Sequence, residues 1–172
     1  MSTLPAWMAL AYRTAMPSHE VMRIALGGGP DPDSFPLDVL DSEAKDFAAL
    51  AELGVRLVTI ADPDYPARIK GESAPILLQV VGSISLLHEP GVEIVAGTSA
   101  EAGRRLHEIV DAGGSAVLLL SKGMLKAKSL LRGLHQPIED GSVVVVTAEP
   151  PRAAWGPVRD QRRNALAAAL RR

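Results

Sequence analysis

The second half of the chain alternates short runs of branched apolar residues with helical patterns, and this alternation restricts the fold more than any other feature. The apolar runs cover residues 92–96, 116–120 and 143–147. The helical patterns cover residues 98–112, 124 to about 132 with a weaker stretch to 138, and 157 or 158 to 170. Continuously apolar strands that alternate with helices predict a parallel sheet covered on both faces. We therefore expect an α/β protein with a Rossmann-like, doubly wound, mostly parallel sheet.

The first half predicts a small helical region ahead of this sheet. We expect helices over residues 4–16, over 19–26 with Ser18 as N-cap, and from 41 or 42 to 53. The glycines of residues 27–29 follow a helix instead of a strand, which predicts a loop and not a phosphate-binding turn. Two more strands are expected over residues 55–60 and 76–81. The predicted organisation is a helical region, residues 1–53, and a shortened Rossmann-like core, residues 54–172.

Composition excludes several classes of protein. The chain has 172 residues and no cysteine, so disulfides, thiolate metal sites and cysteine nucleophiles are ruled out. Aromatic residues make up only 3% of the sequence, so the core must be built from aliphatic side chains. No apolar run approaches the ~20 residues that a membrane-spanning helix needs. The N-terminal apolar stretch has no basic segment ahead of it, so we expect a helix and not a signal peptide, in a cytoplasmic protein.

Charge is distributed unevenly between the two halves of the chain. The formal net charge is −2, but residues 1–90 carry −6 and residues 91–172 carry +4. This asymmetry favours a phosphate-bearing partner for the second half. Ordinary solvated helix faces would account for the same pattern.

The best local candidate for an anion site lies where the strand at residues 92–96 ends. Gly97 turns the chain, and Thr98 with Glu101 forms a capping-box pattern that predicts the start of a helix. A helix N-terminus after a parallel strand offers free N–H groups and a positive dipole end to a phosphate. Capping alone would also explain these residues, and the sequence is not a known phosphate-loop motif.

Two further groups of basic residues follow strands. Ser121-Lys122-Gly123 comes directly after a strand, and Lys126, Lys128 and Arg132 lie on the next helical segment. The other group stands near the start of the last helix and consists of Arg159, Arg162, Arg163 and Asn164. Arginine forks match phosphate geometry, and an Asn amide can contact a base or sugar edge. The alternative for both groups is an exposed, solvated helix face.

Enzymatic chemistry has little support in the sequence. The four histidines are scattered without metal-ligand spacing, and Ser121 has no nucleophile-elbow motif around it. Asp62 and Asp64 flank a proline and lack further ligands, so they predict turn chemistry instead of a metal site. We expect a protein that is not an enzyme and that needs no metal or cofactor.

The chain resembles the DNA-processing protein A (DprA/Smf) family from about residue 53 onward. The most specific stretch is LGVRLVTIADPDYPARIKGESAPILLQVVGSISLL, with its D-x-D-Y-P motif, a proline before an apolar strand and a glycine after it. AGTSAEAGRRLHEIVDAGGSAVLLLSKGML is similar to the family's strand, glycine turn and His-bearing helix. DGSVVVVTAEPP and RDQRRNALAAAL resemble its next strand and its R-N helix.

The resemblance implies an extended Rossmann fold that binds single-stranded DNA and helps to load a recombinase during DNA uptake, in natural transformation and recombination. It implies phosphate contacts from Gly97, Thr98, Ser99, Lys122, Arg162, Arg163 and Asn164. The family's G-S-R turn has no counterpart here, nor has its final strand with a glycine-rich segment. One βαβ unit is therefore expected to be missing, along with parts of the anion pocket and of the sheet edge.

Two other functions stay open from the sequence. The same crevice in related Rossmann-like families binds a free nucleotide, although here Glu149 is followed by two prolines instead of glycines. Alternatively, the chain is an interaction module whose open sheet edge pairs with another chain, because an open edge is relieved by dimerisation. We also expect a homodimer, formed through the sheet edge or through the alanine-rich last helix.

Overall fold

The computed structural model of the chain describes residues 3–97 and 99–172, and it is built around one five-stranded sheet. The strand order is β1-β2-β5-β4-β3. The strands are β1 (Arg56–Thr59), β2 (Leu77–Val81), β3 (Glu93–Val95), β4 (Ala116–Leu119) and β5 (Val143–Thr147). All five lie within one residue of the predicted apolar runs, because each run is long enough to cross the sheet and is bounded by turn residues.

The sheet is mixed, so the expectation of a mostly parallel sheet is corrected. Strands β3, β4 and β5 are parallel, whereas β2 pairs antiparallel with both β1 and β5. The connections explain the difference. A parallel pair needs a crossover, usually a helix, but β1 and β2 are joined by turns and the short 3-10 helix η2 (Ala67–Ile69). Continuous apolar patterning in β2 therefore reflects burial on both faces and not parallel pairing.

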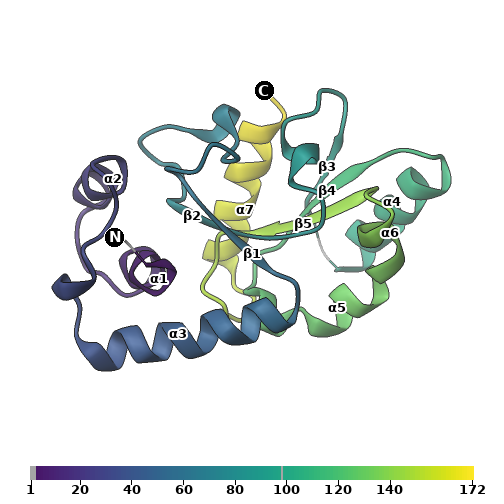
Figure 1. The fold of residues 1–172 in the computed structure, drawn as a ribbon. Helices are drawn as coiled ribbons and strands as arrows, with labels where there is room; N and C mark the ends of the chain where they lie inside the picture. Colours follow the sequence, from purple (N-terminus) through teal and green to yellow (C-terminus); the bar gives the residue numbers. More distant parts are fainter. Residues whose placement is uncertain (1–2, 98) are drawn as a thin grey trace.

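Seven α-helices are formed within the described residues. They are α1 (Leu4–Tyr12), α2 (Ser18–Leu26), α3 (Leu37–Glu52), α4 (Ser99–Asp111), α5 (Lys128–Gly133), α6 (His135–Glu139) and α7 (Pro157–Leu170). Figure 1 shows α1 and α2 at one side of the molecule, α4 to α6 at the other, and α7 between them. Helix α4 packs on β3 and β4, α6 on β5, and α7 on β3 and η2.

Four of the predicted helices differ from the structure. Helix α1 ends at Tyr12, whereas a helix to residue 16 was expected. Helix α3 begins at Leu37, directly after Pro36, because proline is well suited to the entry of a helix, and the predicted N-caps Asp41 and Ser42 lie inside the helix. Helix α2 already includes Ser18, and its N-cap is Pro17 without a side-chain bond. The segment 124–138 is divided into the 3-10 helix η4 (Met124–Lys126), α5 and α6, with Gly133 ending α5.

The hydrophobic core is continuous between the sheet and the N-terminal helices. Trp7 and Met8 of α1 belong to the same buried cluster as the valines of β5. Gln79 in β2 is fully buried, and its amide links three distant segments. Its Nε2 donates to the hydroxyl of Tyr12 (3.1 Å) and the carbonyl of Glu149 (2.6 Å), and its Oε1 accepts from the backbone of Met124 (3.2 Å). This satisfied polar centre fixes the N-terminal helices relative to the ends of β4 and β5.

None of the helices in the described part of the chain is long and apolar enough to cross a membrane.

Candidate functional site

The carboxyl ends of the three parallel strands meet at one rim of the sheet. Val95 of β3 pairs with Leu118 of β4, and Leu118 pairs with Val145 of β5, so the strands end side by side. Gly97 follows β3, and Ser121 with Lys122 follows β4. Ligands of open α/β sheets bind at this end of the strands. The rim is therefore where two of the predicted site residues, Gly97 and Lys122, lie near each other.

Arg163 of α7 joins two of these strand ends. Its Nη1 donates to the carbonyl of Gly97 and to Oγ of Ser121, both at 3.2 Å. Its Nε and Nη2 donate to Oδ1 of Asn164 at 3.2 and 3.1 Å. The Arg163 side chain is only 9% exposed. Arg163 is thus a clamp between α7 and the rim, with each nitrogen already bonded to the protein.

Asp160 lies on α7 one helical turn before Arg163, and it holds an aromatic side chain in position. Its Oδ1 lies 2.8 Å from Nη1 of Arg163, in a charge contact that lacks hydrogen-bond alignment. Its Oδ2 accepts a hydrogen bond of 2.8 Å from the indole nitrogen of Trp155. The Ser121 hydroxyl lowers the pKa of Asp160 most, desolvation opposes this effect in part, and the Trp155 indole and the Arg163 charge lower the pKa further. The carboxylate is therefore held in its ionised form.

A pocket of about 340 Å³ opens between these residues and helices α4 and α5. Most of the residues that line the pocket are apolar or are glycines. The apolar part consists of Gly97, Ala102, Gly103, Leu118, Leu119, Leu120 and Leu130. Ser121, Lys122, Trp155, Asp160 and Arg163 complete the wall. Its lining is thus more apolar than polar, as is usual for pockets that bind small molecules.

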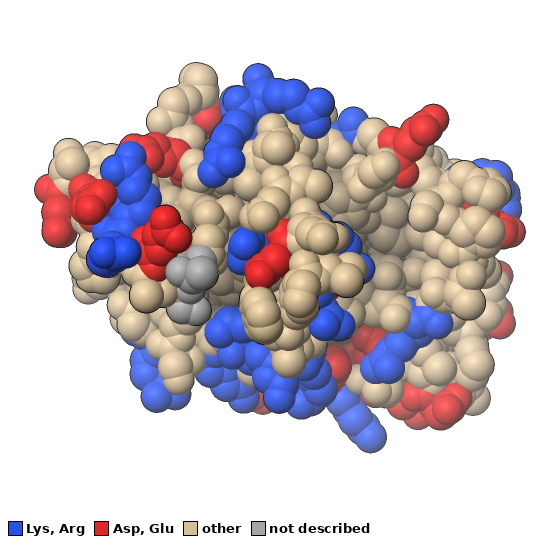
Figure 2. Space-filling view, turned by 180° about the vertical axis from the view of Figure 1, so that it is seen from behind, with Lys and Arg blue, Asp and Glu red and all other residues tan. Residues whose placement is uncertain are grey.

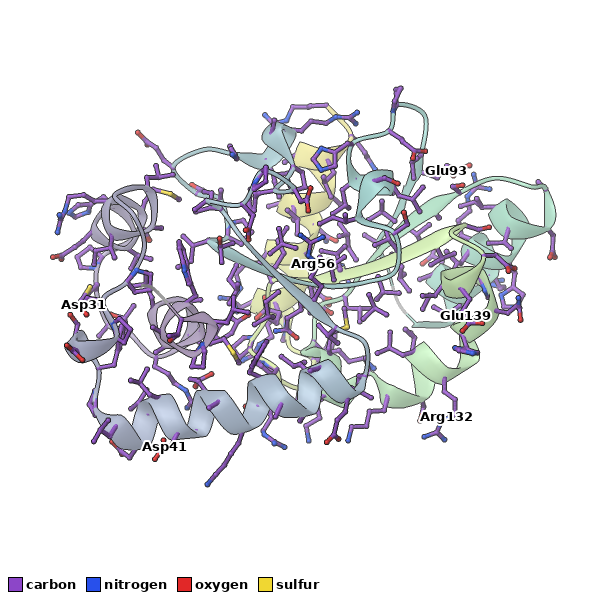
Figure 3. The ribbon with its side chains drawn as sticks, viewed as in Figure 1. Asp31, Asp41, Arg56, Glu93, Arg132 and Glu139 are labelled. Carbon is purple, nitrogen blue, oxygen red and sulfur yellow. The ribbon has the colours of Figure 1, made fainter. Side chains whose placement is uncertain are left out.

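Basic residues without acidic partners extend from the pocket along η4 and α5. Lys122, Lys126, Lys128 and Arg132 form no ion pair with any residue of 3–97 or 99–172. No acid stands between Asp111 and Glu139, so nothing in this stretch neutralises them. Figure 2 shows Lys and Arg side chains gathered along the lower edge of the molecule, and Arg132 points outward there in Figure 3. We call these four residues the basic strip.

Arg162 faces another side of α7 from Arg163. Its Nη2 donates to Oε2 of Glu149 at 2.8 Å, and Nε of Arg159 donates to the same oxygen at 3.1 Å. Glu149 is buried at the end of β5. The structure therefore places Arg163 at the pocket, engages Asn164 as the partner of Arg163, and pairs Arg162 with an acid away from the pocket lining.

The N-terminus of α4 has its own acid. Glu101 stands in its first turn, where a carboxylate complements the helix dipole. A Cβ built on Gly97 would lie 3.8 Å from the Glu101 carboxylate, so this acid is close to the rim. Thr98 lies outside the described residues, and Ser99 is the first residue of α4.

Two features of the rim were missed from the sequence. One is the Trp155–Asp160 hydrogen bond, whose signal would have been an aromatic residue just before a proline-led helix with an acid in its first turn. The other is Gly123, where a Cβ would overlap the carbonyl oxygens of Pro150 and Pro151. This close approach is held by hydrogen bonds from Gly123 N to Ala153 O (2.9 Å) and from Leu125 N to Pro151 O (3.0 Å).

Comparison with known proteins gives a match in structure alone. No protein-family model matches the chain, and no curated protein matches it in sequence. The fold is similar to the crystal structure of DNA processing protein A (DprA) from Streptococcus pneumoniae, with a TM-score of 0.61 and 15% sequence identity. The match covers 99% of this chain and 76% of that chain. The resemblance to DprA that the sequence motifs indicated is thus confirmed at the level of the fold.

Proposed function

We propose that this protein binds single-stranded DNA at the rim, as a DprA-like DNA-processing protein. The observation that carries the proposal is the basic strip, four unpaired cations that begin inside a strand-end pocket and continue away from it. Phosphates attract such cations without regard to base sequence, and a row of them suits a flexible single strand. A role in recombination and natural transformation, and a recombinase partner, belong to this proposal through the fold it shares with DprA.

Each predicted site residue has a role in the proposal. Lys122 at the pocket mouth contacts phosphate directly, and the backbone N–H groups of Gly97 and Ser99 serve as donors beside the start of α4. Thr98, which lies outside the described residues, belongs to the proposal through its place in the sequence. Arg163 links the loops of the rim and contributes positive charge to it, and the neutral amide of Asn164 holds the Arg163 guanidinium in place. Arg162 adds to the field from its place beside Glu149.

The test is a titration of labelled single-stranded DNA, the matching duplex and free nucleotides at two salt concentrations. We expect the single strand to bind more tightly than the duplex, with affinity that falls steeply with salt. Replacing Lys126, Lys128 and Arg132 together by Gln removes three phosphate contacts, which lowers the slope of log K against log salt by about 2 for a single strand.

The matched control is Lys45→Gln, because Lys45 is an exposed lysine on α3 that also lacks an ion pair among the described residues. It should bind like the wild type. Equal binding of single strand and duplex, or a triple variant with unchanged salt slope, would contradict the proposal.

A free nucleotide is the second candidate ligand, favoured by the largely apolar lining of the pocket. In that case mononucleotides would compete with the oligonucleotide at equal or lower concentration, and the triple variant would bind them normally.

A further inference from the structure

We propose that the pocket takes a single unpaired nucleobase, stacked on the exposed ring of Trp155, while the phosphates stay outside on Lys122. This inference rests on the proposed function and adds to it a base-binding step and the residue that performs it. A base in a single strand and the base of a free nucleotide share this chemistry, and the experiment below separates them.

Trp155 has the properties of a prepared stacking surface. Its side chain is 63% exposed, whereas tryptophan side chains are highly buried on average. The other tryptophan of the chain, Trp7, is only 5% exposed. Trp155 is nevertheless fixed, because its indole N–H donates to Asp160 Oδ2 at 2.8 Å. That bond uses the edge of the ring and leaves the faces free. An aromatic ring held in position before the ligand arrives loses little entropy on binding.

The segment that carries Trp155 is also fixed to the rim. Ala153 accepts from Gly123 N at 2.9 Å and donates to Pro150 O at 2.9 Å. Pro157 begins α7 two residues after the tryptophan. The ring is therefore exposed on a well-supported turn, beside a pocket that it helps to line.

The pocket interior favours a neutral ring over a phosphate. Four leucines form much of its wall, and burying an anion against them would cost its hydration without compensation. Asp160 also lies in the wall, and its ionised carboxylate repels phosphate but accepts hydrogen bonds from the N–H groups of a base. Among the described residues, Lys122 is the cation in the pocket wall that forms no ion pair with an acid. A nucleotide is therefore oriented with its base inward and its phosphate at the pocket mouth, next to Lys122.

The size of the pocket limits what can enter. At about 340 Å³ it lies near the lower end of the ~300–1,000 Å³ range of small-molecule sites. One base can enter if it is unstacked from its neighbours and unpaired. A duplex presents no such base, so stacking on Trp155 gives the protein a means of choosing single strands that phosphate contacts alone lack.

The experiment follows tryptophan emission while the protein is titrated with an oligothymidylate, an abasic strand of equal length, and thymidine monophosphate. Trp7 is 5% exposed in the core, so quenching by ligands reports Trp155. We expect saturable quenching by the base-bearing strand and none by the abasic strand. Trp155→Leu should weaken binding of the base-bearing strand about 5- to 150-fold, the range for one lost base–aromatic stack, and leave abasic binding unchanged.

Trp155→Phe should restore most of the affinity, since a phenyl ring also stacks. Val158→Ala is the matched control, because Val158 is an equally exposed apolar residue at the start of α7 that does not line the pocket. It should bind like the wild type. Quenching by thymidine monophosphate at a lower concentration than by the strand also supports the base pocket. In that case the base that enters the pocket belongs to a free nucleotide.

The two proposals fail in different ways. If both strands bind the wild type equally, and Trp155→Leu changes neither, the base pocket is refuted while single-strand binding stands. If neither strand binds but thymidine monophosphate quenches, single-strand binding is refuted and the base pocket stands. If no ligand binds or quenches, both are refuted.

Discussion

Single residues at the rim act mainly through the partners that the fold gives them. Arg159, Arg162 and Arg163 look alike in the sequence, yet two of them pair with Glu149 and the third clamps Gly97 and Ser121. The sequence predicted the R-N segment as part of the site but could not assign these partners. The assignment depends on how the turn of residues 148–156 rotates α7 about its axis, and no local pattern encodes that rotation.

Arg163 gives the prediction at this scale. Arg163→Ala removes charged hydrogen bonds to two loops, so we expect a loss of about 1.5–3 kcal/mol in unfolding free energy and weaker binding of single-stranded DNA. Arg163→Lys keeps the charge but loses the planar fork, so it should be destabilised nearly as much. Chemical denaturation and binding titrations measure both effects.

Arg172→Ala, at the exposed C-terminal residue, is the control and should change neither quantity. If Arg163→Lys matched the wild type in stability and binding, charge alone would explain the residue, and the clamp would have no role.

At the scale of elements, the sequence predicted strands better than their directions or the helix boundaries. Runs such as the four valines of β5 are buried on both faces, so they were recognisable without knowledge of their neighbours. The antiparallel pairing of β2 was in principle deducible, because no helix pattern lies between residues 60 and 76. The close contact of the two loops at Gly123 could not be deduced from the sequence. This contact joins segments about 27 residues apart through backbone atoms alone.

Gly123 gives the prediction for these loops. A Cβ there would overlap backbone oxygens of Pro150 and Pro151, which cannot move aside as a flexible side chain can. Gly123→Ala should therefore force the loops apart, destabilise the protein by about 1–3 kcal/mol, and alter the environment of Trp155. Gly133→Ala is the control, because a Cβ there meets open space in a helix, where alanine is the better helix former. Thermal unfolding of both variants decides the matter, and unchanged stability in Gly123→Ala would show that the loops are not in close contact.

At the scale of the whole molecule, the sheet ends in two edge strands, β1 and β3, and a groove lies along β3. Glu93 and Val95 bond toward β4, so the backbone of Ile94 points outward, and its carbonyl accepts a hydrogen bond of 2.9 Å from Arg171. A groove of about 650 Å³ runs along this edge between α4 and the end of α7. Helix α7 is a poorer dimer surface, because Ala167 and Leu170 are already buried within the protein.

We therefore expect the predicted homodimer to form through β3 and not through α7. Pairing two edges would satisfy the outward backbone groups of β3, and Arg171 would have to release Ile94. Ile94→Pro removes the outward N–H without removing a bond to β4, so it should leave the fold intact and abolish the dimer. Ala165→Glu, on the exposed face of α7, should leave the dimer unchanged. Sedimentation velocity at about tens of micromolar, a range suited to weak complexes, measures the outcome. A monomeric wild type would refute the dimer, and a dimer broken by Ala165→Glu but not by Ile94→Pro would move the interface to α7.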